Sequence, residues 1–417
     1  MAAVKTAARK EPSLGVLSFG FVICGIVTVL PGPMLPLLAG RWHLADVQSG
    51  AFFTAEFVAS TIASVLAPKR MRWSLPRGYA LMTIGVLLLV VAALTEGPTA
   101  GHLLALGSFL LIGFGIGLSV TATNLVVGAA PKEQRARRLS VVNLWWGIGA
   151  VACPWMVAAA EKLGDLRMLL VFVAWASVAM FVVLISLREE RGRVVHPISL
   201  RADAGILIYF AIMLFLYVGV ENSVGGWVAT YVFRYNGLTL ANASMVVSAF
   251  WLMLLLGRWI GSQALKSIPE RAVLLPSICL SLAALVTFVA PHERVWVIAA
   301  AALTGLGFGP IFPIGVARML SRVSDARNTG WVFAITASGG AVLPWLTGLF
   351  STKLASLRTG FMVPAVGLGV VLLLALAENL LLGRPNSAVL AEPAPVQEIP
   401  APAESDDAGE SNRYSFP

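Results

Sequence analysis

Charged residues are scarce in this chain. Asp, Glu, Lys and Arg together make up 12% of its 417 residues, while apolar residues make up 58%. A soluble domain carries roughly twice that charged share, and a soluble protein of this length could not bury so much apolar surface. Composition therefore excludes an ordinary soluble protein and predicts an all-α integral membrane protein whose solvent is largely lipid.

Cysteine and histidine are too few to build a metal centre or a disulfide framework. The three cysteines, Cys24, Cys153 and Cys279, lie inside apolar runs without paired spacing, so we expect them to be small buried hydrophobes. The phosphate-binding pattern G-x-x-x-x-G-K-[ST] does not occur. We therefore expect no metal, no cofactor, no direct use of ATP and no enzymatic activity.

The net charge of +9 comes from short basic clusters between apolar runs, which is not the pattern of a nucleic-acid surface. If both termini are cytoplasmic, the cytoplasmic segments hold 22 Lys and Arg and the outer loops hold 7. This bias follows the positive-inside rule. It predicts a multi-pass protein of the inner (plasma) membrane with cytoplasmic N- and C-termini and no nucleic-acid partner.

Two stretches of the chain repeat each other. Lys162-Leu163 and Leu166-Arg167 recur 191 residues later as Lys353-Leu354 and Leu357-Arg358. The glycine cluster at 113–117 recurs at 305–309. Because the repeated unit consists of apolar runs, the duplication predicts a transporter of two matched halves.

A window of about 20 residues finds twelve apolar runs able to cross a bilayer, each expected to be a helix. The predicted spans are 14–38, 47–67, 78–95, 102–127, 139–160, 168–187, 204–230, 238–264, 272–290, 295–317, 331–352 and 359–382. The predicted organisation is a cytoplasmic N-terminus (1–13), a six-helix bundle (14–187), a cytoplasmic linker (188–203), a second six-helix bundle (204–383) and a disordered cytoplasmic tail (384–417).

Motifs in three runs carry a resemblance to a known family, and those of the seventh and eighth runs narrow it to one branch. They are Asn143–Ala150 in the fifth run, Tyr217–Glu221 and Gly225–Trp227 in the seventh, and Phe250-Trp251 and Gly257-Arg258 in the eighth. Twelve spans with these motifs resemble the major facilitator superfamily, and within it the fucose-permease-like branch of sugar:proton symporters. The resemblance implies the major facilitator fold and a secondary transporter of hexoses or related solutes.

The chain departs from that branch in its first and fourth runs. Proton-coupled fucose permeases carry acids there, whereas this chain has Thr28 in the first run and Thr121, Thr123 and Asn124 in the fourth. Both the identity of the sugar and its coupling to protons therefore stay open.

Only three of the 21 acidic residues, Glu56, Glu221 and Glu378, lie within predicted spans. An ionisable group at mid-membrane costs on the order of 3 kcal/mol, so it is a functional hypothesis by default. Glu378 is close enough to the cytoplasmic end to be expected as a solvated helix-end acid. Glu56 has no base within reach along its helix and is the predicted proton carrier; the alternative is a permanently protonated acid that bonds a neighbouring helix.

Polar and aromatic groups in the spans give a candidate solute site. The expected substrate-binding residues are Tyr217, Glu221, Asn222, Asn143, Trp146 and Trp251, with Glu221 also in proton coupling; each can instead be a packing or helix-break residue. The expected gate or packing residues are Asn124, Gly149, Pro154, Gly340, Pro344 and Arg258. Four other tryptophans are expected in interfacial belts: Trp42, Trp73, Trp227 and Trp296.

The favoured hypothesis is a secondary active transporter that imports a small polar solute, a sugar, together with a proton. The solute would sit between the halves, which alternately open to either side, and one chain would suffice as a monomer. The alternative is a proton-driven exporter of drugs or hydrophobic metabolites, which the missing acids and the many aromatic residues favour.

Overall fold

The structure, a computed structural model, describes five stretches of the chain: 12–128, 132–186, 204–290, 293–323 and 330–383. Residues up to Gly383 form one compact unit, which within the described ranges is helical and contains no strand. The predicted linker and C-terminal tail, and nearly all of the N-terminal segment, lie outside the described residues.

Twelve spans in the described ranges are long and apolar enough to cross a membrane, and they confirm the predicted spans to within five residues at every boundary. The helices of the first half are α1 (Leu14–Val29), α2 (Pro31–Trp42), α3 (Asp46–Leu66), η1 (Ala67–Arg70), α4 (Met71–Leu94), α5 (Pro98–Gly128), α6 (Lys132–Lys162) and α7 (Leu166–Ser186). Those of the second half are α8 (Ala204–Tyr235), α9 (Leu240–Ala264), α10 (Glu270–Val289), α11 (Arg294–Phe308), α12 (Ile311–Leu320), α13 (Gly330–Lys353), α14 (Leu357–Gly360) and α15 (Met362–Leu381).

Three spans are interrupted, which is why twelve spans contain more than twelve helical elements. The first breaks between α1 and α2, where Pro31 lacks the amide hydrogen needed to continue the helix. The tenth breaks at Gly309 and Pro310, between α11 and α12, and the last breaks between α14 and α15. The last carbonyls of a helix have no partner within it. Here the carbonyl of Phe308, the last residue of α11, accepts a hydrogen bond from the hydroxyl of Tyr217 at 2.7 Å.

The repeated glycines pack their helices in the same way in both halves. A methyl group built on Gly113 of α5 would collide with the carbonyl oxygen of Glu56 on α3, and one on Gly305 of α11 would collide with that of Phe250 on α9. Small residues let helix backbones approach this closely. The duplication seen in the sequence is therefore a structural one, in which α5 packs on α3 as α11 packs on α9.

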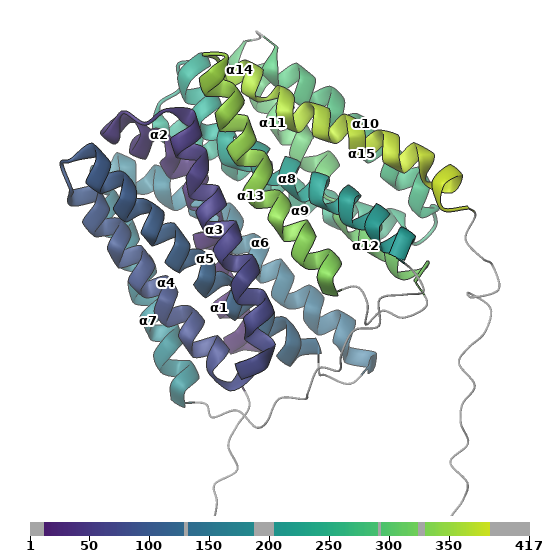
Figure 1. Ribbon diagram of the computed structural model, residues 1–417, viewed down its shortest axis with the longest axis horizontal. Helices are drawn as coiled ribbons and strands as arrows, with labels where there is room; N and C mark the ends of the chain where they lie inside the picture. Colours follow the sequence, from purple (N-terminus) through teal and green to yellow (C-terminus); the bar gives the residue numbers. More distant parts are fainter. Residues whose placement is uncertain (1–11, 129–131, 187–203, 291–292, 324–329, 384–417) are drawn as a thin grey trace, which may run out of the picture. The chain divides into compact units, whose positions relative to one another are not determined.

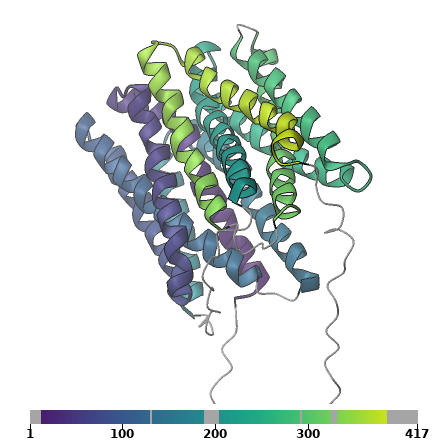
Figure 2. The same cartoon turned by 45° about the vertical axis from the view of Figure 1, so that its right-hand side comes forward.

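The two halves join chiefly along α3 with α13, α6 with α9, and α2 with α8. Figure 1 and Figure 2 both show α3 and α13 running side by side, although they are nearly 300 residues apart. We call the end of the unit where α2 ends and α3 begins the Asp46 end. The ends of α8 and α13 lie there too, since residues in the last turns of both helices bond to Asp46.

Two tryptophans and one cysteine differ from the sequence-based expectation. Trp42 and Trp227, expected in interfacial belts, are 2% and 0% exposed. Trp42 packs against Gly101 of α5, and the indole of Trp227 donates to the carbonyl of Pro344 at 2.9 Å. Cys279, expected to be buried, is exposed on α10. Local hydrophobicity cannot distinguish a lipid-facing side from a protein-facing side, because both are apolar.

Candidate functional site

A polar cluster of Tyr217, Glu221 and Arg258, which we call the α8–α9 cluster, lies in the second half and also reaches α11. Glu221 and Tyr217 lie one turn apart on α8, and the Tyr217 hydroxyl is 2.6 Å from Oε2 of Glu221. From α9, Nη2 of Arg258 approaches the same oxygen to 3.9 Å. Tyr217 is fully buried and Glu221 is 8% exposed. The predicted substrate residues Tyr217 and Glu221 are therefore in contact, and Arg258, expected only in a gate or packing role, pairs with the acid.

Two tryptophans meet across the joint between the halves. The rings of Trp146 on α6 and Trp251 on α9 lie with their centroids 5.9 Å apart, nearly perpendicular. Gly225 on α8 makes room for this pair, since a methyl group there would lie 3.0 Å from the Trp251 ring. The helices that carry the predicted substrate residues, α6, α8 and α9, therefore meet at one place.

Two hydrogen-bond donors on α9 remain unused. Nε1 of Trp251 and Nε of Arg258 are buried without an acceptor among the described residues. They are seven residues apart, which places them on the same side of α9, two turns from each other. A buried donor without an acceptor costs about 1–3 kcal/mol. A bound solute with acceptor oxygens would remove that cost.

The two asparagines of the predicted site bond to their own helices. The amide of Asn222 donates to the carbonyl of Val218, and that of Asn143 donates to the carbonyl of Leu139, both at 2.8 Å. Asn143 is exposed, and its described hydrogen bond stays on α6 and does not reach Tyr217 or Glu221. Neither described bond holds an amide toward the α8–α9 cluster.

Glu56 occupies a different environment on α3. It is 1% exposed, and neither of its carboxylate oxygens has a hydrogen-bond partner among the described residues. Its backbone lies against Gly113, and no described cation pairs with it. Burial of an ionised carboxylate without a partner costs several kcal/mol, so this acid must bind something, a proton or a ligand group, when it is sequestered.

The other predicted gate or packing residues lie at helix contacts. Gly149 on α6 faces the backbone of α1, and Gly340 on α13 faces the ring of Phe57 on α3. Pro154 and Pro344 are inside α6 and α13. Oδ1 of Asn124 is buried on α5 without a donor among the described residues.

Glu378 contradicts the expectation of a solvated helix-end acid. It is 1% exposed and accepts hydrogen bonds from Arg318 at 2.8 and 2.9 Å. Nε of Arg322 lies 2.9 Å from Oε1 of the same carboxylate. The apolar pattern places Arg318 and Arg322 in a loop after the tenth span, so it contains no sign that they reach the last span.

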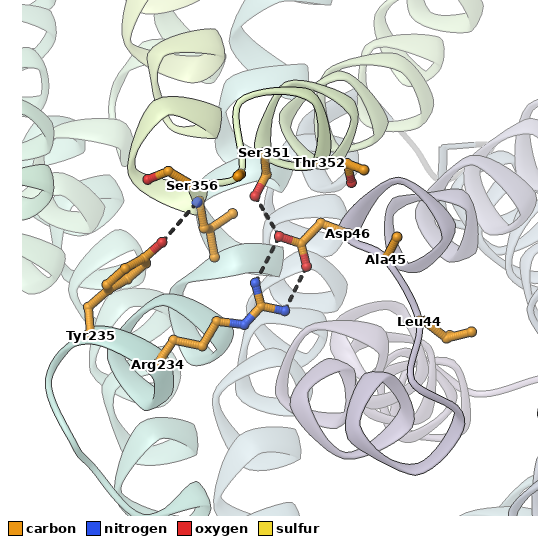
Figure 3. A pocket seen from close by; sticks show the side chains of 10 residues that line it. Leu44, Ala45, Asp46, Arg234, Tyr235, Ser351, Thr352 and Ser356 are labelled. Carbon is orange, nitrogen blue, oxygen red and sulfur yellow. Dashed lines mark hydrogen bonds and ion pairs between the residues drawn. The ribbon is translucent and has the colours of Figure 1, made fainter.

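An ion pair that was not predicted closes the Asp46 end (Figure 3). Asp46 begins α3 in the first half, and Arg234 lies in the last turn of α8 in the second half; their bonds measure 2.6 and 2.8 Å. Ser351 of α13 donates to the same carboxylate. Each charge is also favoured by its helix end, an acid at an N-terminus and a base at a C-terminus.

Further hydrogen bonds tie the halves together. The backbone amide of Val47 donates to the hydroxyl of Thr352 at 2.9 Å, and Thr54 donates to the carbonyl of Ala341 at 2.9 Å. Ser248 of α9 donates to the carbonyl of Val151 on α6 at 3.1 Å, near the middle of α6. The first of these bonds lies beside the Asp46 ion pair, and the second joins α3 and α13 about two turns further along α3.

Known proteins resemble this chain over nearly all of its helical part. The sequence profile of the Major Facilitator Superfamily matches residues 17–325. A glucose/galactose transporter of Brucella abortus biovar 1 (strain 9-941) is 24% identical over 380 residues, which cover 84% of this chain and 90% of that protein.

Solved structures show the same fold. A bacterial homolog of the human lysosomal transporter Spinster, inward-facing and occupied, has a TM-score of 0.74 at 12% identity and covers 91% of this chain and 98% of its own. The fucose:proton symporter of E. coli has a TM-score of 0.58 at 16% identity, with coverages of 87% and 97%.

Proposed function

The chain belongs to the Major Facilitator Superfamily, and from that premise we propose that it carries a sugar across the membrane together with a proton. The superfamily expected from the sequence is confirmed, and the relatives agree with its fucose-permease-like branch. The chain is a multi-pass membrane protein of a transporter family. Its solute, its coupling to protons and its direction of access are inferred from the site geometry and from the relatives.

The observation that carries the proposal is the α8–α9 cluster, whose two helices also pack at the Trp146–Trp251 pair between the halves. It offers the carboxylate of Glu221, which the Tyr217 hydroxyl holds in place, and the unused donors of Trp251 and Arg258. A sugar presents paired donors and acceptors on one side and C–H groups on the other. Polar groups at fixed positions beside aromatic rings suit such a solute, and the Brucella relative is named for glucose and galactose.

Proton coupling is assigned to Glu56, with Glu221 as the acid that contacts the solute. Glu56 lacks any described partner that could compensate its charge, so binding a proton is the simplest way to bury it. Glu221 already has Tyr217 and Arg258 beside it. Glu56 lies in the first half and Glu221 in the second. Proton binding and solute binding can therefore both affect how one half moves against the other.

The contacts at the Asp46 end support alternating access. If the basic clusters mark the cytoplasm, the Asp46 end faces outward, both termini face inward, and the structure is closed to the outside. Import then requires α3 to separate from α8 and α13 at this end. The pathway lies within one chain, so a monomer suffices.

Uptake by the purified chain in proteoliposomes tests the proposal. Labelled d-glucose and d-galactose should accumulate when the outside is made acidic, and Glu221→Gln should raise the KM. Absence of sugar uptake, with expulsion of hydrophobic dyes driven by the same gradient, would replace the proposal with the exporter alternative.

A further inference from the structure

A small pocket opens beside the ion pair at the Asp46 end. Its volume is about 290 Å³. Its walls come from both halves: the start of α3, the end of α8, the end of α13 and the start of α14 (Figure 3). The polar residues that line it are Asp46, Arg234, Tyr235, Ser351, Thr352 and Ser356.

Some of these polar groups are used and others are not. Asp46 is occupied by Arg234 and Ser351, and the Thr352 hydroxyl both accepts from Val47 and donates to Gly348. The Tyr235 oxygen accepts from the amide of Leu357 at 3.0 Å, which leaves its own proton to donate. Together with the hydroxyl of Ser356 and Nε of Arg234, the pocket has three donors without a described acceptor.

This chemistry fits a polyhydroxy solute. Hydroxyl groups both accept and donate, so one molecule can accept from Ser356 and Tyr235 and also donate to a carboxylate. The apolar side chains of Leu44 and Leu357 complete the lining and can meet C–H groups. A purely apolar solute would leave the donors unsatisfied, and a cation would meet the guanidinium of Arg234.

Resting on the proposed function, we propose that this pocket is an external docking subsite for a polyhydroxy solute. A docked solute donates to Asp46 and accepts from Arg234 in place of their ion pair. Asp46 belongs to the first half and Arg234 to the second, so this exchange of hydrogen bonds releases the closed end. The solute favours opening because only the separated pair has both groups free to bind it.

A cysteine at position 49 reports on the closed end. Ser49 is 1% exposed, lies one turn from Asp46 on the same side of α3, and differs from cysteine by a single atom. The reporter is Ser49→Cys combined with Cys279→Ser, in the full chain in right-side-out vesicles. Reaction with a membrane-impermeant maleimide should be slow without sugar and faster with d-glucose, but not with betaine at equal osmolarity.

Two variants distinguish opening of the Asp46 end from binding of the solute in the pocket. In Asp46→Asn, labelling should be at least about tenfold faster without sugar, because a charged hydrogen-bond pair is lost. In Ser356→Ala the ion pair is kept, so labelling without sugar stays slow. The d-glucose concentration for half-maximal labelling should then rise about two- to tenfold, as expected for one lost hydrogen bond. Ser262→Ala, an exposed serine near the far end of α9, is the matched control.

The outcomes distinguish this inference from the proposed function. If d-glucose enters proteoliposomes but does not change labelling, or if Ser356→Ala responds to sugar as Ser262→Ala does, the docking subsite is overturned and transport stands. If d-glucose changes labelling through Ser356 but is not taken up, the subsite stands and the transport proposal is overturned.

Discussion

Glu56 and Glu378 are buried to the same degree in opposite electrostatic surroundings. Each is 1% exposed. Glu378 lies at the end of α15 between two guanidiniums, 2.8 Å from Nε of Arg318 and 2.9 Å from Nε of Arg322. Neither oxygen of Glu56 has a partner among the described residues.

The difference separates a structural acid from a functional one. A buried carboxylate between cations holds the helices that carry them together, because removing either partner leaves an uncompensated charge. A buried carboxylate without cations gains nothing from its charge and must take up a proton or a ligand. Glu378 therefore ties α15 to the end of the tenth span, whereas Glu56 is available to change its protonation state.

The largest effect is expected from Glu378→Ala. It leaves Arg318 and Arg322, whose side chains are 13% and 5% exposed, without their shared carboxylate. The expected loss of stability is about 3–5 kcal/mol, measured by thermal or denaturant unfolding in detergent. Glu270→Ala is the control: Glu270 also pairs with Arg318 but is 41% exposed, so it should cost at most about 1 kcal/mol. Equal stability of the two variants would mean that burial between two guanidiniums does not make Glu378 a structural acid.

How much of the fold and of the candidate site can be predicted from the sequence depends on how far apart along the chain the contacting residues are. Apolar periodicity and length are local properties, and they located all twelve spans. The pair Tyr217 and Glu221 was also predictable, since residues four apart share one side of a helix. The partners of Glu378, and Arg258 beside Glu221, depend on how each helix is rotated against its neighbours. When all sides of a helix are apolar, its sequence does not show which side faces which neighbour.

Asp46 and Arg234 illustrate the same limit at the helix ends. They are 188 residues apart, and by apolar pattern alone both are loop charges. One usable indication is present in the sequence: an acid at the start of the second span and a base at the end of the seventh, on the same predicted side. Without knowing that α3 and α8 meet, this arrangement cannot be distinguished from ordinary solvated charges.

The repeated glycines allow the surroundings of Glu56 to be compared with the equivalent position in the second half. Gly113→Ala and Gly305→Ala each force a methyl group into a neighbouring carbonyl, of Glu56 and Phe250 respectively. Both should lower stability by about 1–3 kcal/mol, measured by unfolding in detergent. Gly369→Ala is the control, because nothing lies within 4 Å of a methyl group there.

Only the first of these glycines adjoins the proposed proton carrier. Gly113→Ala should therefore also alter the pH dependence of sugar uptake, whereas Gly305→Ala should reduce uptake equally at all pH values. Identical pH profiles for the two variants would argue that the backbone position of Glu56 is irrelevant to coupling.

Tyr217→Phe should have a smaller effect on stability. It removes the hydroxyl that contacts Glu221 and the Phe308 carbonyl, at 2.6 and 2.7 Å, and keeps the ring. The expected cost is about 1–2 kcal/mol, with a rise in the KM for sugar because Glu221 loses the group that orients it. Tyr209→Phe is the control, since the described bond of that hydroxyl goes to the carbonyl of Leu374, away from the α8–α9 cluster. A KM that rises equally in both variants would mean the Tyr217 hydroxyl has no specific role at the site.

The smallest change in stability and the most specific change in function are expected from Glu56→Gln. Glutamine has the same shape and no charge, and no described ion pair is lost, so unfolding should shift by less than about 1 kcal/mol. Uptake by the wild type should increase as the outside becomes more acidic, by at most about tenfold in apparent affinity per pH unit for one linked proton. In the variant this dependence should be flat, while exchange of internal for external sugar continues, since exchange needs no net proton movement. Glu378→Gln, tested beside it, should lose stability and keep the pH dependence of whatever folded protein remains. If Glu56→Gln keeps the wild-type pH profile, the proton is carried elsewhere, and Glu221 becomes the acid to test.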